Sequence, residues 1–134
     1  MMNFWNGAGV AIVTPFKDGQ IDFDAMAGLL NWQIEQGTDA LIIAGTTGES
    51  ATLSKAEKLE LFAFALKTAA GRVPIIAGTG SNNTADSVAL SVAAEQLGVD
   101  GLLLVTPYYN KPSQRGLYAH YKAIAEAVAI PVIL

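Results

Sequence analysis

The chain has 134 residues, of which 51% are hydrophobic and 15% charged, with a formal net charge of −4. The acidic balance argues against a nucleic-acid partner, and the absence of cysteine excludes disulfides and zinc–thiolate sites. No apolar run is long enough to span a membrane and the N-terminus has no basic region, so we expect a cytoplasmic protein that binds no membrane.

Five short apolar runs alternate with four amphipathic segments along the chain. The runs cover residues 8–13, 40–44, 74–77, 102–105 and 131–134, and their length and branched aliphatic content predict buried parallel strands. Between them, apolar side chains recur every three or four positions, which predicts helices over residues 22–36, 54–70, 83–97 and 113–128. The chain therefore reads β-α-β-α-β-α-β-α-β.

Start and stop signals agree with these helices. Ser54 and Glu57 have the spacing of a capping box at the second helix. The other expected N-caps are Asp22, Asn83 and Ser113, and three glycines stand where helices should end: Gly37, Gly71 and Gly98. Residues 35–41 also resemble residues 95–102, and both segments join a helix to the next strand, which weakly supports a repeated unit.

Such alternation fits either a doubly wound sheet or a (β/α)8 TIM barrel. A dinucleotide fingerprint is missing, because Asn83 occupies the third glycine position after Gly78 and Gly80, and there is no P-loop triplet. The barrel is preferred, with residues 1–134 supplying strands one to five and helices one to four of a single domain. Five strands do not close a barrel, so we expect a truncated sequence.

Ligands of parallel barrels bind at the loops that follow the strands. In residues 45–50, Gly45 and Gly48 flank Thr46 and Thr47, whose hydroxyls suit a carboxylate or a proton relay. The glycines would let amide groups face a small anion, and the next helix would add a positive dipole end. An ordinary βα turn explains the same residues, and the residues alone favour that simpler interpretation.

The other strand-end residues carry weaker signals. Tyr108 and Tyr109 stand beside two prolines, and aromatic packing explains them more simply than proton transfer does. His120 lies within the fourth helix, where a position on the surface or in helix packing is expected rather than a catalytic role. Glu49 is the single carboxylate on these loops and could fix its own loop by accepting backbone hydrogen bonds. No second carboxylate or histidine stands at ligand spacing, so no metal is expected. We also expect no cofactor.

Schiff-base chemistry needs an amine whose pKa is lowered by burial. Lys17 and Lys111 lie in polar loops, whereas the other lysines lie on expected helices: Lys55, Lys58, Lys67 and Lys122. None lies in an apolar strand, so we predict no nucleophilic lysine within these residues.

Taken together, the loops resemble those of a known family. Residues 45–50, Gly-Thr-Thr-Gly-Glu-Ser, resemble the signature of the dihydrodipicolinate synthase and N-acetylneuraminate lyase superfamily. The similarity extends over the whole chain and includes residues 10–15, 77–82 and 105–114. The paired threonines and the Tyr-Tyr-Asn-Lys-Pro segment resemble the synthases more closely than the sugar-acid lyases.

The resemblance implies a class I aldolase-type lyase of lysine biosynthesis. It would condense pyruvate, held as an imine on a strand-six lysine, with aspartate semialdehyde. Thr47 would bind the pyruvate carboxylate, and Thr46 would join a proton relay with two tyrosines. One of these is Tyr109, which would reach into a neighbouring subunit, so a homodimer or a dimer of dimers is implied. The second tyrosine, an arginine and the reactive lysine would lie beyond Leu134.

The resemblance also implies a site for feedback inhibition by lysine at the dimer interface, with five matching positions: Ala51, Lys55, Asn82, Asp86 and Tyr108. Lys55 stands where inhibited family members often carry histidine. Its charge would repel the ammonium groups of lysine, so we expect weak or absent inhibition.

Two other functions remain open. The protein could be a neuraminate or keto-deoxy-sugar-acid aldolase of the same superfamily, which substrate screening would separate from a synthase. It could also be a non-catalytic half-barrel, either a folding fragment or an assembly module that covers its open strand edges by self-association.

Overall fold

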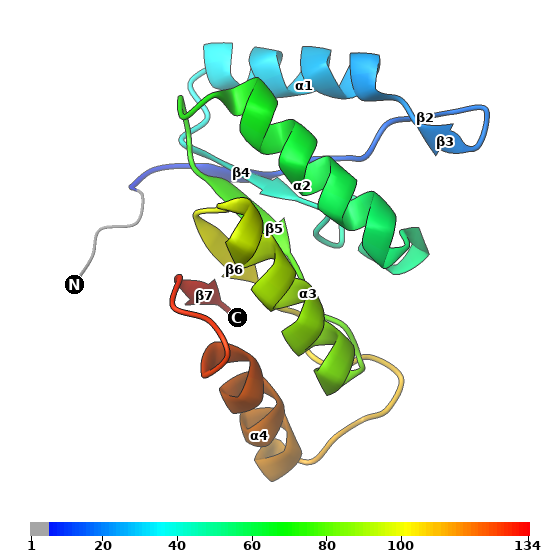
Figure 1. The fold of residues 1–134 in the computed structure, drawn as a ribbon, viewed down its shortest axis with the longest axis vertical. Coiled ribbons are helices and arrows are strands. Elements are labelled where there is room, and N and C mark those ends of the chain that lie inside the picture. The colour runs from blue at the N-terminus through cyan, green and yellow to red at the C-terminus, as the bar shows by residue number, and fades with distance from the viewer. Residues whose placement is uncertain (1–5) are drawn as a thin grey trace.

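The computed structural model describes residues 6–134, in which one parallel sheet is covered by helices (Figure 1). Residues 1–5 of the expected domain lie outside this description. The sheet consists, in spatial order, of β1 (Gly9–Ala11), β4 (Ala40–Ile43), β5 (Ile75–Gly78), β6 (Gly101–Leu103) and β7 (Val132–Ile133). The helices are α1 (Phe23–Glu35), α2 (Lys55–Ala69), α3 (Thr84–Leu97) and α4 (Gln114–Ala125).

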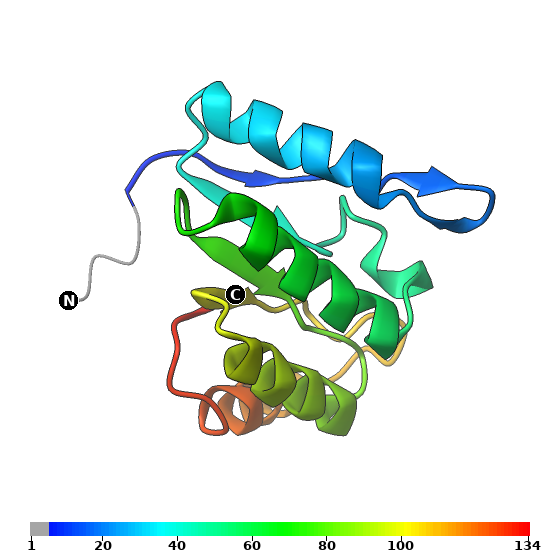
Figure 2. The same ribbon diagram turned by 45° about the horizontal axis from the view of Figure 1, so that its top comes forward.

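The strand order distinguishes between the two expected architectures. A doubly wound sheet reverses its order at a switch point and carries helices on both faces. Here every neighbouring pair is parallel and the strands follow one another without reversal. Each helix packs on the next along one face of the sheet, as Figures 1 and 2 show. The chain is therefore a partial (β/α) barrel, and the preference for a barrel is confirmed.

The core lies between the sheet and this layer of helices. In β4, Leu41 and Ile43 are buried against the helices, while Ile42 on the other face is only partly buried, as the two-residue period of a strand requires. Each such side chain contributes roughly 1.5–3 kcal/mol when fully buried. Packing on the helix side thus holds the strands in register, and their ends are free to carry a site.

The helices begin at the expected caps. The Ser54 hydroxyl accepts a hydrogen bond from the Glu57 amide at 3.2 Å, and the Glu57 carboxylate accepts one from the Ser54 amide at 2.7 Å. Asp22, Asn83 and Ser113 cap the other three helices. These reciprocal bonds satisfy amides that the first helical turn leaves unpaired, which confirms the predicted starts.

The fourth helix ends at Ala125, three residues before the end expected from its sequence. The carboxylate of Glu95 accepts hydrogen bonds from the amides of Ala129 at 2.7 Å and Ile130 at 3.2 Å. This contact with α3 draws the chain out of the helix and toward β7. Strand ends differ by similar amounts: β1 is shorter than expected, and β6 begins and ends earlier.

An antiparallel hairpin, β2 (Phe16–Lys17) with β3 (Gln20–Ile21), lies where a plain loop is expected. Asp18 and Gly19 form its turn with φ values of 52° and 78°. Two left-handed residues are what a tight hairpin turn of this hand requires, and Asp-Gly is a favoured sequence for it. In residues 6–134, no helix has the length and apolar character needed to cross a membrane.

Candidate active site

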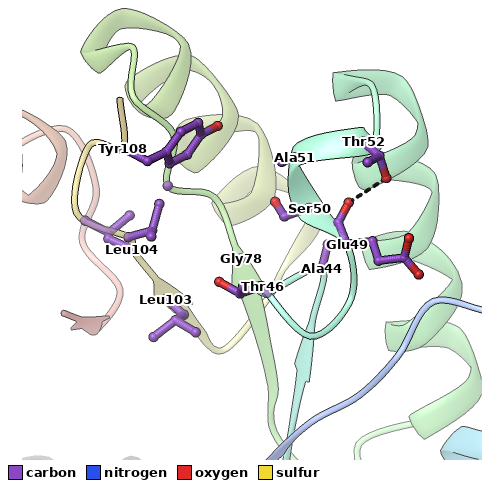
Figure 3. Close-up of a pocket in the computed structure, with 13 residues that line it drawn as sticks. Ala44, Thr46, Glu49, Ser50, Ala51, Thr52, Gly78, Leu103, Leu104 and Tyr108 are labelled. Atoms are coloured by element: carbon purple, nitrogen blue, oxygen red, sulfur yellow. Dashed lines mark hydrogen bonds between the residues drawn. The ribbon is translucent and has the colours of Figure 1, made fainter. Parts of the chain in front are cut away.

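A pocket of about 470 Å³ opens where β4, β5 and β6 end (Figure 3). Leu103, Leu104 and Val105 form an apolar wall. Hydroxyl groups come from other loops, and the side chains that carry them are Thr46, Ser50, Thr52 and Tyr108. This is the end of a parallel barrel at which ligands bind, so the structure places a chemically mixed cavity at the expected edge.

The floor of this pocket is largely main chain. A Cβ atom at Gly78 would collide with the carbonyl oxygen of Ala44, and one at Gly80 would collide with the amide nitrogen of Val105. Both glycines are thus required by the close approach of neighbouring backbones rather than by an unusual φ. The absence of side chains there leaves the strand ends open to a small ligand.

The loop after β4 is fixed mainly by its own backbone. The amides of Gly48 and Ser50 donate to the carbonyl of Gly45 at 3.0 and 3.3 Å, and the amide of Glu49 donates to the carbonyl of Thr46 at 3.1 Å. The buried hydroxyl of Thr14, at the end of the first strand segment, donates to the carbonyl of Gly48 at 2.7 Å. Two strand-end loops are thereby joined beneath the pocket.

Several expectations for this loop are wrong in detail. Neither Gly45 nor Gly48 has a positive φ, and the amides after Thr47 are used within the loop rather than turned toward a ligand. The carboxylate of Glu49 accepts no hydrogen bond from residues 6–134; its carbonyl instead accepts from the Thr52 hydroxyl at 2.9 Å. A short 3-10 turn, η1 (Ser50–Thr52), separates the loop from α2, so no helix dipole adjoins it directly.

Two threonines of this loop carry donor groups that the loop itself does not use. The hydroxyl and amide groups of Thr46 and Thr47 make no hydrogen bond with any other described residue, and both side chains are exposed. Thr46 lines the pocket, whereas Thr47 lies beside it on the same loop without lining it. The structure therefore gathers two free hydroxyls and two free amides at the mouth of the cavity, which is a suitable donor set for a carboxylate.

The two tyrosines of the loop after β6 separate. Tyr108 lines the pocket from above, as Figure 3 shows, while Tyr109 is 93% exposed and lines no pocket. The backbone of Tyr109 has a φ of 71°, a region that few bulky residues adopt without a functional or structural reason. Within a single chain, Tyr109 is not brought to Thr46, and its expected role in a neighbouring site stays a prediction.

A second pocket of about 370 Å³ lies between the starts of α2 and α3 and the loop after β6. All five positions expected for lysine inhibition line it: Ala51, Lys55, Asn82, Asp86 and Tyr108. Their gathering in one cavity supports a shared ligand site, although the ligand is a separate question. Tyr108 and Ser50 also line the first pocket, so the two cavities share a wall.

The sequence analysis missed one residue of this second pocket. Lys58 lines it and is only 8% exposed, and burial lowers the pKa of its ammonium group. A signal was present, because residues 58, 61, 62, 65 and 69 fall on one face of α2 and that face is buried. A lysine with a lowered pKa thus exists in the chain. It lies on a helix outside the first pocket, so the prediction that the reactive lysine lies elsewhere stands.

His120 packs between helices, which decides between the surface and packing positions expected for it. It is 6% exposed, and its Nδ1 atom lies 2.8 Å from the Thr84 hydroxyl of α3. Burial lowers the pKa of the ring. Among residues 6–134, no group of three or more His, Asp or Glu side chains is arranged to hold a metal ion.

Comparison with known proteins identifies the family. Residues 5–134 match the family described as the Dihydrodipicolinate synthetase family. The chain belongs to this family. It is 57% identical over 129 residues to a 4-hydroxy-tetrahydrodipicolinate synthase of Neisseria gonorrhoeae, a match that covers 96% of the chain and 44% of that relative.

Solved structures of the dihydrodipicolinate synthetase family agree with the fold. A chloride-inhibited dihydrodipicolinate synthase from Acinetobacter baumannii complexed with pyruvate is 54% identical, with a TM-score of 0.93 over 96% of this chain and 44% of its own. An enzyme from Cyanidioschyzon merolae with lysine bound is 44% identical, with a TM-score of 0.90 over 94% and 44%. The chain therefore spans less than half the length of these proteins and corresponds to their N-terminal half.

Proposed function

We propose that residues 1–134 form the first half of a single barrel domain in a 4-hydroxy-tetrahydrodipicolinate synthase. The complete protein condenses pyruvate, as an imine on a lysine, with aspartate semialdehyde. The observation that carries this proposal is the cavity at the ends of β4, β5 and β6, where Thr46 and Thr47 present unused donors. The synthase relatives, one of them complexed with pyruvate, support the same substrate class.

In this proposal the threonine loop receives the carboxylate of the keto acid. Thr47 donates to it through its hydroxyl and amide, and each charge-assisted bond is worth roughly 1.5–3 kcal/mol. Thr46, which lines the pocket, accepts and passes a proton through its hydroxyl. The main-chain floor at Gly78 and Gly80 supports this, because it lets a ligand of few atoms lie against the strand ends.

Tyr109 completes the proton relay from a neighbouring subunit. Its exposure of 93% and its absence from the lining of the cavity of its own chain support this assignment. The active assembly is then a homodimer or a dimer of dimers. We also propose a cytoplasmic location, where such a biosynthetic enzyme meets its substrates.

The test uses the complete natural protein, with pyruvate plus aspartate semialdehyde as one substrate pair and neuraminate or keto-deoxy-sugar acids as competitors. We expect turnover of the first pair and a pyruvate adduct after borohydride reduction. Thr46→Val should reduce kcat at least tenfold, and Thr46→Ser should restore most of it because the hydroxyl returns. Preferred cleavage of a sugar acid would identify a neuraminate or keto-deoxy-sugar-acid aldolase instead. Failure to form any adduct would favour a non-catalytic role.

Residues 6–134 alone should give no pyruvate adduct under the same conditions. Lys58 is the one lysine whose lowered pKa could contradict this expectation, and it lines the second pocket. Mass spectrometry of the reduced chain therefore separates the two cases. An adduct on any lysine of this chain would place the chemistry at a site that the proposal does not include.

A further inference from the structure

The second pocket contains charges that the proposed catalysis does not use. Lys55 and Lys58 bring two positive charges and Asp86 brings one negative charge to its wall. In residues 6–134 the single ion pair joins Lys122 and Glu126, so none of these three groups is neutralised by another side chain. The pocket therefore has a net positive charge that remains available to a ligand.

Lys58 is the most enclosed of the three charged residues. Its side chain is 8% exposed, and its ammonium group makes no hydrogen bond with any other described residue. The lowered pKa has desolvation as its sole cause, with no compensating partner. The ammonium group at the end of this largely buried side chain is partly desolvated and faces the pocket without a carboxylate beside it, so a bound anion would be favoured there.

The remaining lining defines the rest of the ligand. Leu53, Leu90 and Ala51 give a short apolar surface suited to methylene groups, and Asn82 adds an amide group at the rim. The volume of about 370 Å³ falls within the roughly 300–1,000 Å³ of small-molecule sites. Two cations and one anion around such a cavity complement a molecule that has two carboxylates and one ammonium group on a short carbon chain.

We propose that the second pocket binds an acidic amino acid, with its carboxylates at Lys58 and Lys55 and its ammonium group at Asp86. Lysine, with two ammonium groups and one carboxylate, has the opposite charge pattern and binds more weakly at this site. The inference does not rest on the proposed catalytic activity, because the groups involved lie outside the threonine loop.

The experiment is isothermal titration calorimetry on the complete natural protein at constant ionic strength, with L-glutamate, glutarate, L-lysine and inorganic phosphate. L-Glutamate should bind at least tenfold more tightly than the other three. Lys58→Met should weaken L-glutamate at least tenfold, since a charge-assisted bond is lost. Lys17→Met, at an exposed hairpin lysine, is the matched control and should leave binding unchanged.

Asp86→Asn tests the ammonium contact separately. It should reduce L-glutamate to the affinity of glutarate while leaving glutarate binding intact. The proposal fails if L-lysine binds as tightly as L-glutamate, or if a folded Lys58→Met variant retains full affinity for L-glutamate. It also fails if phosphate binds as tightly as L-glutamate, because the pocket would then be a general anion site. Because the assay measures binding, a protein that lacks synthase activity would still give an interpretable result.

Discussion

At the scale of single residues, Thr14 connects the end of the first strand segment to the loop that carries the free donors. Its buried hydroxyl donates to the carbonyl of Gly48 at 2.7 Å. Thr14→Val should leave that carbonyl unpaired, at a cost of roughly 1–3 kcal/mol in unfolding free energy.

The same substitution should lower kcat/KM of the complete protein about tenfold, because the loop at Thr46 loses its anchor. Thr14→Ser keeps the hydroxyl and should remain close to the parent in both measurements. Denaturant melts and steady-state kinetics on the two variants check this. Equal activity of the valine and serine variants would show that the bond does not position the loop.

Lys55 and Lys58 lead to a prediction about regulation. The two positive charges on the wall of the second pocket repel the two ammonium groups of free lysine. We therefore expect weak or absent inhibition by lysine. Titrating the complete enzyme with L-lysine under standard assay conditions measures it. Strong inhibition at submillimolar lysine would contradict the expectation, and Lys55→His should increase whatever sensitivity exists.

At the scale of elements, two aspartates fix the start of neighbouring strands in the same way. The Asp39 carboxylate accepts from the Ala8 amide at 2.7 Å, and the Asp100 carboxylate accepts from the Ile75 amide at 2.8 Å. These residues occupy equivalent places in the two similar sequence segments. The echo between residues 35–41 and 95–102 therefore corresponds to a shared strand-tying contact.

Asp100→Ala should consequently destabilise the chain by roughly 1–3 kcal/mol and speed hydrogen exchange of the Ile75 amide at the start of β5. Asp100→Asn retains a side-chain carbonyl that can still accept, and it should lose less. Unchanged exchange at Ile75 in the alanine variant would mean that the strand is held by its neighbours alone.

The buried ring of His120 between α3 and α4 leads to a prediction about acid stability. Burial lowers its pKa in the folded chain, so the unfolded chain binds its proton more readily. Its contribution to stability is complete above the unfolded value of about 6.5 and is lost as the pH falls through the folded pKa. The melting temperature should therefore drop more steeply between pH 7 and 5 in the parent than in His120→Gln. Parallel curves would contradict this.

Element order and helix starts could be predicted from the sequence because they depend on local signals. The caps at Asp22 and Ser54 and the period of the apolar residues act within a few positions, and the structure follows them. The early end of α4 depends on Glu95, a residue about 30 positions away in another helix, so local patterns could not reveal it. The hairpin at Asp18 and Gly19 was readable from its turn residues and was overlooked.

The site was less predictable than the fold for a similar reason. Loop composition indicated Thr46 and Thr47, but the direction of each amide depends on bonds from Gly45 and Thr14 that only the folded loop displays. The burial of Lys58 follows from the helix face it shares with Leu61 and Phe62. Charged residues are seldom buried without a partner, so a lysine on a helix does not by itself indicate burial.

At the scale of the whole molecule, the exposed Tyr109 yields a test of the assembly. If it serves a neighbouring site, then Thr46→Val and Tyr109→Phe subunits are each inactive alone but complementary when mixed. One of the two sites in a hybrid dimer would contain an intact Thr46 and an intact Tyr109. Coexpression should therefore restore activity, to roughly half of the parent per hybrid dimer if its two sites act independently. No recovery would assign Tyr109 to its own chain or to no site.

The main-chain floor formed at Gly78 and Gly80 limits how this protein can diversify. Side chains cannot be introduced there without pushing neighbouring strands apart. Substitutions at these two positions therefore cannot change the shape of the cavity floor without disturbing the fold. New substrate preferences would have to arise at the rim, where Ser50 and Tyr108 line the cavity with side chains that the proposed chemistry does not use. A library confined to those rim positions should yield more folded and selective variants than one that includes the two glycines.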